Sequence, residues 1–562
     1  MSPIGSFGDF RYTKNPFNPK FERQMMSGTC RYKFLVIDDQ DLLEISNLTR
    51  KVNQAIKHPE PVVKMDAPWD TDDDVFDLAS VVYDEADGLF KMWYQIYTVD
   101  SRREYGPSCP AKMAYAFSSD GLNWEKPILN RLEINGTMEH NFVTPEMGNF
   151  SMSVLIDPSD PSERRFKMMF LADSGFGSGG ETDWAKFHVP LCIAYSPDGI
   201  HWDRPVHVNP VLRGVSDGIF ALYYDEDRRK YVLFSRRVPN LPRDISQYES
   251  YDLVNWEDKG RVLVAGDEFD SRYTTDLHAF SPVRYEQFHL AVINTMYTLP
   301  ESESYSVFQK PPADYPNQML GTMDLQLAYS RDGQNWSRPN DRSPVVALGP
   351  AGSPDGGFIF PINNPIVRDG DTWIYYSSRC RRHNDWDLHQ SGYNVTPRNE
   401  GFGMLAKMPE DHWVSLDADN NEGSFVCKPW GPPHEIFVNA DAQGGSIEAE
   451  LVTPYGKVVP DYSRNDCIAA TASGKNQQIK WKNGKSAWES IAKDHRGGLL
   501  MKFYLKNAKL YSYTFTLPDA DGQLERDRVN ARWCEHIKHR SGNWGRNSNE
   551  PATGRAALPT TS

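Results

Sequence analysis

The chain has 562 residues and a formal net charge of −15, with 61 Lys and Arg against 76 Asp and Glu. This length accommodates two or more domains, and the negative charge disfavours nucleic acid and anionic membranes as partners. No run of about 18 apolar residues is present, so no membrane span is expected. Aromatic residues make up 12% of the chain, and together with 40 Gly and 39 Pro they favour an all-β protein with many turns.

The seven cysteines are dispersed and form no Cys-x-x-Cys pair, so we expect reduced thiols rather than a disulfide framework or a zinc site. We predict no cofactor and no metal, although the acidic cluster at residues 70–74 leaves a cation site open. Residues 1–20 lack the apolar core of a signal peptide, which predicts a cytoplasmic protein. Secretion stays open if a signal peptide has been removed.

Residues 1–60 are predicted to form an irregular arm and one strand. The apolar run Tyr32–Ile37 is the strand. Residues 40–57 alternate poorly between polar and apolar types, which fits either a short helix or a polar strand.

From residue 61 onward, one turn returns at long intervals. It has serine, Asp-Gly, Trp and proline at constant spacing, and it occurs as Ser118–Pro127, Ser196–Pro205 and Ser330–Pro339, with a degenerate copy at 251–256. Each copy follows a short apolar run, so it is predicted to be a hairpin whose Trp packs back on the strand. A turn repeated in this way indicates an array of similar sheets.

Paired apolar strands precede each turn and define five units. The strand pairs are 78–83 with 90–94, 153–158 with 165–170, 220–224 with 230–234, 280–283 with 288–293, and 360–362 with 372–376. Their spacing of roughly 45–70 residues is typical of propeller blades. Because one blade cannot bury both faces alone, the units are expected to stack around an axis. We therefore predict a five-bladed β-propeller over residues 61–428.

The pattern changes after about residue 430. Residues 429–518 contain alternating runs such as Ile447–Val452 and Leu510–Phe515, which describe antiparallel strands with one buried face and predict a β-sandwich. Residues 519–562 lose this periodicity, so a mobile or draped tail is expected there.

Several of these motifs resemble glycoside hydrolase family 32-like proteins of the fructosidase and arabinanase superfamily. The matching residues are Phe90–Tyr94, the Ala-Tyr-Ser-x-Asp-Gly-x-x-Trp turns and Val438–Gly445. The likeness covers about residues 32–517 and implies an all-β glycosidase, with a five-bladed propeller followed by a β-sandwich. The catalytic motifs diverge, because the family's Trp-Met-Asn-Asp-Pro-Asn-Gly segment is replaced by Pro68–Asp74.

Glycoside cleavage needs one carboxylic acid to protonate the leaving oxygen and one carboxylate to attack or to activate water. In a propeller, both groups lie where the inner strands meet the channel mouth, just before the first apolar run of each blade. The acidic residues at this position are the predicted catalytic candidates: Asp73, Asp74, Asp276, Asp217 and Glu139. Asp77 is a further candidate, because it lies at the same position relative to its strand. Each of these residues also fits an ordinary turn or a solvated loop.

The expected substrate contacts are acidic, basic and aromatic residues near the same strand ends. They are Asp355, His140, His278, Arg272, Arg236, Arg381, His383 and Trp69. Arginines, Arg379 included, bind carboxylates through paired N–H groups, and a solvated basic rim is the alternative. Trp93 continues an apolar strand and is predicted to lie in the core.

The sequence therefore predicts a glycoside hydrolase or transglycosylase that acts on a furanoside-type or related oligosaccharide through paired carboxylates. Asp73 or Asp74 is expected to be nucleophile or base, Asp276 to be acid or pKa-setting partner, and Asp355 to bind substrate. Two alternatives stay open. One is a polysaccharide lyase that acts on a uronate-containing glycan, and the other is a non-catalytic carbohydrate-binding propeller.

Overall fold

The computed structural model describes residues 29–98, 110–134, 136–148, 152–171, 189–215, 220–237, 243–271, 274–298, 321–383, 400–428, 432–487 and 499–518. The predicted tail, 519–562, and residues 1–28 of the predicted arm lie outside these ranges. The described part of the chain is built almost entirely of β-strands, so the all-β prediction is confirmed. Residues 51–413 form one compact unit, and residues 29–50 with 414–518 belong to a second.

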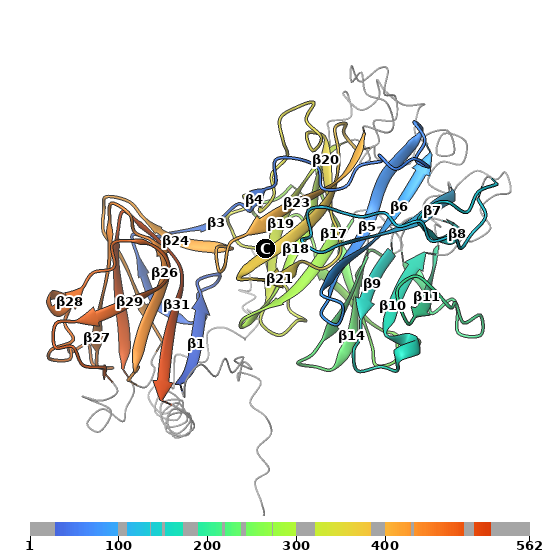
Figure 1. Ribbon diagram of the computed structural model, residues 1–562. Coiled ribbons are helices and arrows are strands. Elements are labelled where there is room, and N and C mark those ends of the chain that lie inside the picture. Colours follow the sequence, from blue (N-terminus) through green and yellow to red (C-terminus); the bar gives the residue numbers. More distant parts are fainter. Residues whose placement is uncertain are drawn as a thin grey trace, which may run out of the picture. The chain divides into compact units, whose positions relative to one another are not determined.

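Groups of antiparallel strands make up the first unit and follow the predicted repeat (Figure 1). The first three groups are separate four-stranded sheets. Their strands are β5 (Asp74–Asp84), β6 (Leu89–Thr98), β7 (Pro110–Ser118) and β8 (Phe142–Gly148); β9 (Met152–Ile156), β10 (Phe166–Leu171), β11 (Val189–Ser196) and β12 (Leu212–Val215); and β13 (Ala221–Asp225), β14 (Lys230–Ser235), β15 (Ile245–Ser250) and β16 (Glu257–Leu263).

The fourth and fifth repeats share one eight-stranded sheet. Its strands are β17 (Thr275–Tyr285), β18 (Phe288–Thr298), β19 (Gly321–Ser330), β20 (Phe358–Pro361), β21 (Ile366–Arg368), β22 (Asp371–Arg379), β23 (Gly401–Met408) and β4 (Ile56–Lys57). The two repeats meet in a parallel pairing of Met323 in β19 with Phe358 in β20. Strand β4 pairs with β23, so residues early in the chain complete the fifth group.

The inner strands of the groups contact one another in a closed order. Strand β5 contacts β9, β9 contacts β13, β13 contacts β17, β17 contacts β20, and β22 and β23 contact β5. Serine hydroxyls join neighbouring inner strands: Ser80 Oγ accepts the N–H of Val154 at 3.0 Å, and Ser153 Oγ accepts the N–H of Leu222 at 2.8 Å. This ring is the arrangement of a propeller, and each group is a blade.

Apolar side chains fill the interfaces between successive blades. Trp93 and Phe166 lie in the cluster between the first and second blades, and Phe234 and Phe280 lie in the cluster between the third and fourth. Trp93 is fully buried, which confirms the prediction that it belongs to the core. Below, the end of the ring at which the inner strands begin is called the strand-start end, and the opposite end, which carries the repeated turns, is the turn end.

Local hydrogen bonds hold each repeated turn. Asp120 Oδ1 accepts the backbone N–H groups two and three residues further along, both at 2.8 Å, and Asp198 and Asp332 make the same pair of bonds. The degenerate turn keeps these bonds at Asp252, although Leu253, with a φ of 65°, replaces the glycine. The Ser-x-Asp segment therefore specifies the turn even where Gly is lost.

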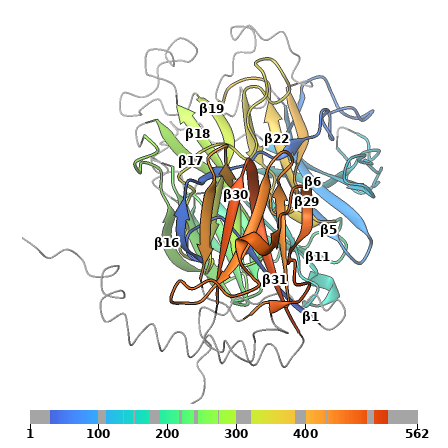
Figure 2. The same ribbon diagram turned by 90° about the vertical axis from the view of Figure 1, so that its left-hand side faces the viewer.

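The second unit contains two sheets that enclose a common core (Figure 2). The first sheet has the order β28 (Cys467–Ile468), β29 (Ser473–Trp481), β26 (Glu435–Asp441), β31 (Ala508–Pro518), β24 (Val414–Ala418) and β3 (Thr49–Val52), with β1 (Thr29–Leu35) also beside β31. The second has the order β2 (Leu42–Ser46), β25 (Gly423–Cys427), β30 (Leu500–Lys506) and β27 (Ser446–Val452). Burial alternates along β27 and β30, as in a sandwich.

The boundaries of the sandwich differ from the prediction. The C-terminal segment of the second unit begins at Val414 rather than at residue 429. The unit also takes in β1 and β2, which were predicted as an N-terminal arm and strand. Strand β1 pairs with β31 along its whole length, from Thr29 with Pro518 to Leu35 with Ser512. A strand whose partner lies at the other end of the chain has no local sequence signal for that pairing. Among the described residues, no helix is both long and apolar enough to span a membrane.

Candidate active site

Two inner strands carry β-bulges at the strand-start end. In β5 the pairing with β6 shifts between Phe76 and Ala79, and in β17 the pairing with β18 shifts between Leu277 and Ala279. A bulge leaves a residue out of the ladder and re-aims its side chain. The side chains affected are those of Asp77 in the first blade and His278 in the fourth.

Asp77 forms a buried ion pair with an arginine of the fifth blade. Arg379, the last residue of β22, donates from Nη2 to Asp77 Oδ1 at 2.5 Å. The same guanidinium donates from Nη1 to the backbone oxygen of Phe76. Both ionised side chains are almost completely excluded from solvent. The guanidinium therefore binds the Asp77 carboxylate through one N–H group and the backbone of the preceding residue through another.

Glu400 adds a second carboxylate to this group. It lies directly before β23 and is fully buried. Its Oε1 accepts a hydrogen bond from Arg381 Nε and lies 3.8 Å from Arg379 Nε. Its Oε2 is buried and has no hydrogen-bond partner among the described residues. An unsatisfied buried carboxylate oxygen costs stability, so its retention is informative about function.

Asp276 forms the equivalent ion pair between the third and fourth blades. It is the second residue of β17 and is buried. Arg243, which lies just before β15, donates from Nη1 to Asp276 Oδ2 at 2.8 Å and from its backbone N–H to Oδ1 at 3.2 Å. Side chain and backbone of one residue therefore hold this carboxylate in place.

His278 lies two residues further along β17 and is buried. Burial, together with the positive charges of Arg236 and Arg243 and the neighbouring His383, lowers the pKa of His278 well below its usual value. The imidazole is therefore neutral at neutral pH. Its ring centroid lies 5.2 Å from that of Phe360 and 5.4 Å from that of His383. Its Nδ1 is buried without a hydrogen-bond partner.

Aromatic rings connect the two ion-paired groups. The Arg379 guanidinium lies 6.0 Å from the ring centroid of Phe358, and that ring lies 5.5 Å from His383. The connected residues are called the strand-start cluster and are Asp77, Arg379, Glu400, Arg381, Phe358, Phe360, His383, His278, Arg236, Arg243 and Asp276. Four of the blades contribute to it: the first, third, fourth and fifth.

The cluster contains five of the predicted site residues: Asp276, His278, Arg236, Arg381 and His383. Two other predicted residues, Asp217 and Arg272, lie outside the described residues.

The remaining predictions fall elsewhere. Asp73 and Glu139 are exposed. Asp74 is buried, and its Oδ2 accepts the backbone N–H of Thr71 at 2.7 Å, so it caps the turn that precedes β5. In the first blade, Asp77 rather than Asp73 or Asp74 therefore reaches the cluster.

Two predicted binding residues, Asp355 and Trp69, are engaged in contacts that hold the fold. Asp355 accepts a hydrogen bond from Lys57 Nζ at 2.6 Å and one from the Tyr376 hydroxyl at 3.2 Å. Trp69 donates from Nε1 to the side-chain oxygen of Asn141 at 3.0 Å.

His140 is buried with its ring centroid 4.4 Å from that of Phe142. Burial lowers the pKa of His140, and its Nε2 has no hydrogen-bond partner. Its position against Phe142 assigns it to the outer part of the first blade, because Phe142 opens β8.

Sequence reasoning missed Arg243 and Glu400. Glu400 lies directly before β23 and Arg243 lies two residues before β15, and each of these strands is the third of its blade in sheet order. The run Ile245–Ser250 is mostly polar and gave no strand signal, so the residue before it had no assigned place. The third strand of each blade can be located by its distance from the repeated turn. The residues just before that strand would then have been candidates.

One group of residues has the composition of a metal site. Ligand atoms of Asp225, Asp227 and His289 lie within 4.8 Å of one another. However, Arg228 Nε lies 2.7 Å from Asp225 and Arg284 Nε lies 3.1 Å from Asp227, so two arginines already neutralise the carboxylates.

The acidic side chains at residues 70–74 do not all lie in one environment. Asp72 and Asp73 are exposed, whereas Asp70 is buried with Lys126 Nζ 3.2 Å from its Oδ2. Burial raises the pKa of Asp70 despite this lysine.

No protein-family model and no curated protein matches the chain. Among solved structures, it is similar to the GH32 β-fructofuranosidase of Bombyx mori, with 13% identity, coverage of 82% of this chain and 94% of that chain, and a TM-score of 0.39. It is similar to the GH43 arabinoxylan arabinofuranohydrolase from Bacillus subtilis, with 11% identity, coverage of 82% and 99%, and a TM-score of 0.34.

A glycosyl hydrolase from Bacteroides ovatus is also similar, with 10% identity, coverage of 63% of this chain and 94% of that chain, and a TM-score of 0.38. At these identities and TM-scores the likeness does not identify an activity, and the chemistry proposed below rests on the residues of this chain. In structure, the chain is similar to glycoside hydrolases of families 32 and 43.

Proposed function

We propose that this protein is a glycoside hydrolase or transglycosylase that acts on a furanoside-type or related oligosaccharide. One observation carries the proposal. Asp77 and Asp276 stand at the strand-start ends of inner strands in two different blades, and each carboxylate is fixed by a buried arginine. Glycoside cleavage requires two carboxyl groups that flank the scissile bond.

The roles follow from the surroundings of each acid. Asp77 and Asp276 are held by arginines and suit the carboxylate functions, which are attack on the anomeric carbon or activation of water. Glu400 is also held by an arginine, and its Oε2, which accepts no hydrogen bond from the described residues, suits contact with a substrate hydroxyl. Asp77 takes the role that was predicted for Asp73 or Asp74.

His278 supports a second candidate, a polysaccharide lyase acting on a uronate. A lyase needs a neutral base to abstract the proton beside the carboxylate and a cation to neutralise that carboxylate. His278 is neutral because of burial and the charges of Arg236 and Arg243, so base and cations stand together. The product would carry a new C=C bond conjugated to the carboxylate and would absorb in the ultraviolet.

A substrate screen with the wild type and Asp276→Asn tests both candidates. The substrates are aryl fructosides, arabinosides and galactosides, together with a uronate-containing polysaccharide. The hydrolase proposal expects aryl-group release by the wild type, reduced roughly 10²–10⁴-fold in the variant. Thermal unfolding of both proteins verifies that the variant is folded.

Two outcomes would overturn the hydrolase. Ultraviolet-absorbing product from the polysaccharide, lost in His278→Gln, would assign the lyase. Glycan binding without any turnover would assign a carbohydrate-binding propeller.

A further inference from the structure

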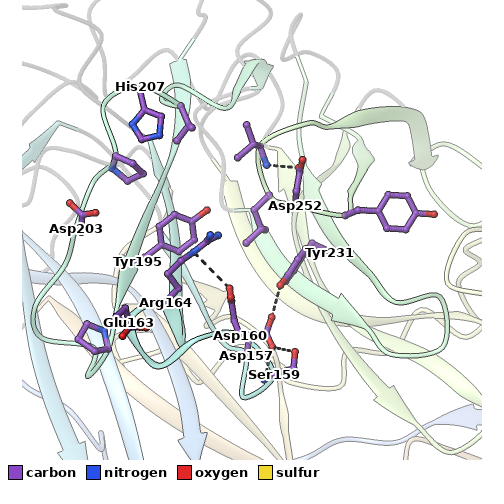
Figure 3. Close-up of a pocket in the computed structure, with 16 residues that line it drawn as sticks. Asp157, Ser159, Asp160, Glu163, Arg164, Tyr195, Asp203, His207, Tyr231 and Asp252 are labelled. Carbon is purple, nitrogen blue, oxygen red and sulfur yellow. Dashed lines mark hydrogen bonds and ion pairs between the residues drawn. The ribbon is translucent and has the colours of Figure 1, made fainter.

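A cavity of about 850 Å³ lies at the turn end, between the second and third blades (Figure 3). The segment after β9 and the turn after β11 form one wall, and β14 and the degenerate turn after β15 form the other. The inner strand β9 ends here, so the cavity and the strand-start cluster lie at opposite ends of the ring. Its volume is within the range of about 300–1,000 Å³ found for small-ligand sites.

The cavity is rich in carboxylates. Its lining includes Asp157, Asp160, Glu163, Asp203 and Asp252, and Arg164 is the one arginine among its lining residues. Ionised carboxylates only accept hydrogen bonds, so the cavity disfavours uronates and phosphates and favours a ligand rich in donors.

Two of the carboxylates are ionised at neutral pH. Burial acts to raise the pKa of Asp157, but hydrogen bonds from Ser159 and Tyr231 outweigh it and lower that pKa. Burial also acts to raise the pKa of Asp252. Hydrogen bonds from the backbone N–H and the side-chain amide of Asn255 outweigh this effect and lower that pKa to about 2. Because these two carboxylates already accept hydrogen bonds from the protein, they form part of the cavity wall and are not counted as ligand contacts.

Glu163 and Asp203 are the carboxylates available to a ligand. Both are exposed, and among the described residues neither side chain has a hydrogen-bond or ion-pair partner. Figure 3 shows them on the same side of the cavity as Tyr195 and Arg164. Two acceptors that are not used by the fold suit a ligand that presents several hydroxyl groups.

Tyrosine rings supply the apolar surface of the cavity. The Arg164 guanidinium covers one face of Tyr195 at 4.1 Å from its centroid, and the Tyr231 hydroxyl is used by Asp157, so both rings are fixed. Tyr251, by contrast, is 74% exposed and belongs to the degenerate turn that forms the opposite wall. An exposed aromatic ring on one wall and free carboxylates on the other match an oligosaccharide, because each sugar has one apolar C–H face and a rim of hydroxyls.

We propose that this cavity is a second, non-catalytic binding site for a neutral oligosaccharide. Tyr251 stacks on one sugar ring, and Glu163 and Asp203 on the other wall accept hydrogen bonds from hydroxyls of the same oligosaccharide. The identity of the ligand class rests on the proposed function. Because the site lies at the end of the ring opposite the strand-start cluster, it holds glycan without taking part in bond cleavage.

Native electrophoresis through gels that contain soluble arabinan or fructan tests the proposal. The wild type is expected to be retarded relative to a gel without glycan. Tyr251→Ala and the double variant Glu163→Gln/Asp203→Asn are expected to lose at least tenfold in affinity. Tyr455→Ala is the matched control, because Tyr455 is also 74% exposed but lies in the second unit. Cleavage of small aryl glycosides is expected to be the same in all of these proteins.

The outcomes separate this proposal from the proposed function. If the wild type is not retarded by either glycan, or if Tyr251→Ala and Tyr455→Ala are retarded equally, the second site is wrong, whatever the enzymatic activity. If retardation depends on Tyr251 but no glycoside is cleaved, the site stands and the catalytic proposal fails. If Asp276→Asn is not retarded and Tyr251→Ala still is, the glycan binds at the strand-start cluster and the proposal is overturned.

Discussion

The repeated turns and the strand-start cluster use aspartate in different ways. At the turn end, Asp120 accepts hydrogen bonds from backbone N–H groups only two and three residues away. At the strand-start end, Asp77 binds an arginine 302 residues away and Asp276 binds one 33 residues away. The first arrangement builds a turn and is complete within one hairpin. The second fixes a carboxylate between blades, and it exists only after the ring has formed.

In the repeated turns, the short separation between the aspartate and its backbone partners identifies a structural role. Any hairpin with the Ser-x-Asp segment can form the local bonds, and they satisfy the carboxylate completely. An ion pair between blades costs desolvation of both charges. Such a pair is retained where a fixed carboxylate is needed, which is the expectation for a catalytic site.

The largest expected effect comes from exchanging one carboxylate at each end. Asp77→Asn is expected to lower kcat/KM roughly 10²–10⁴-fold, because the amide cannot attack or activate water. Asp198→Asn, at the turn end, is expected to leave kcat/KM unchanged within about twofold, because its partners are local backbone groups. Initial rates on the best aryl glycoside measure both values. Equal loss in the two variants would show that the distinction between the ends has no catalytic meaning.

A second test compares a buried arginine with an exposed one. Arg243→Met leaves the Asp276 carboxylate buried without its cation, and a loss of about 3–5 kcal/mol in the free energy of unfolding is expected. Arg237 pairs with Asp258 at the surface, where both side chains are more than one-third exposed. Arg237→Met is therefore expected to cost less than about 1 kcal/mol. Urea unfolding followed by tryptophan fluorescence measures both.

If Arg243→Met were as stable as Arg237→Met, the strand-start ion pairs would not be held by the ring. Replacing both members, as Arg243→Met with Asp276→Leu, is expected to recover part of the lost stability while activity stays absent.

The repeated units were predictable because their signals are local. The segment Ser118–Pro127 contains the serine, aspartate and glycine that form its turn, so the pattern alone locates the hairpin. The sandwich boundary was not predictable, because β1 pairs with β31 across nearly the whole chain. An apolar run such as Tyr32–Ile37 indicates a strand but contains no information about its partner.

The candidate site was predictable only in part, for the same physical reason. Asp276 and His278 were located by their position before an apolar strand. In the first blade, several acids precede β5, and a bulge selects Asp77 over Asp74. A bulge depends on the pairing of β5 with β6 and has no sequence signal of its own. Glu400 was missed because its role arises from arginines in a neighbouring strand.

A third test concerns the packing at the turn end. Gly199 has a φ of 81°, and a Cβ there would lie 2.5 Å from the Trp93 ring. Gly136 has a similar φ of 78°, but a Cβ there would meet no atom within 4 Å. Both Gly→Ala variants carry the left-handed backbone penalty of roughly 1–2 kcal/mol, and overpacking is expected to cost Gly199→Ala about 1–3 kcal/mol more.

Urea unfolding of the two glycine variants gives this difference directly, since the backbone term cancels. The hydrogen bond from Trp93 Nε1 to the Gly199 oxygen, 2.6 Å long, would be strained in the same variant. Equal stabilities would mean that the turn does not pack on the neighbouring blade in the way described.

The smallest expected effect is a pH dependence of the turn end. Burial acts to raise the pKa of Asp198, but the N–H groups of His201 and Ile200 outweigh it and lower the pKa from 3.8 to about 2. A lowered pKa in the folded state means that the carboxylate stabilises the fold above the unfolded value and loses this effect as pH falls from about 4 to about 2. The side chain is 44% exposed, so the stabilisation is expected to stay below about 1 kcal/mol.

Unfolding free energies of the wild type and Asp198→Asn, measured from pH 6 downward, are expected to differ by a constant amount until about pH 4 and then to converge. A difference that does not change with pH would show that the turn depends on the shape of this side chain rather than on its charge, and would remove the electrostatic part of the contrast with the strand-start end.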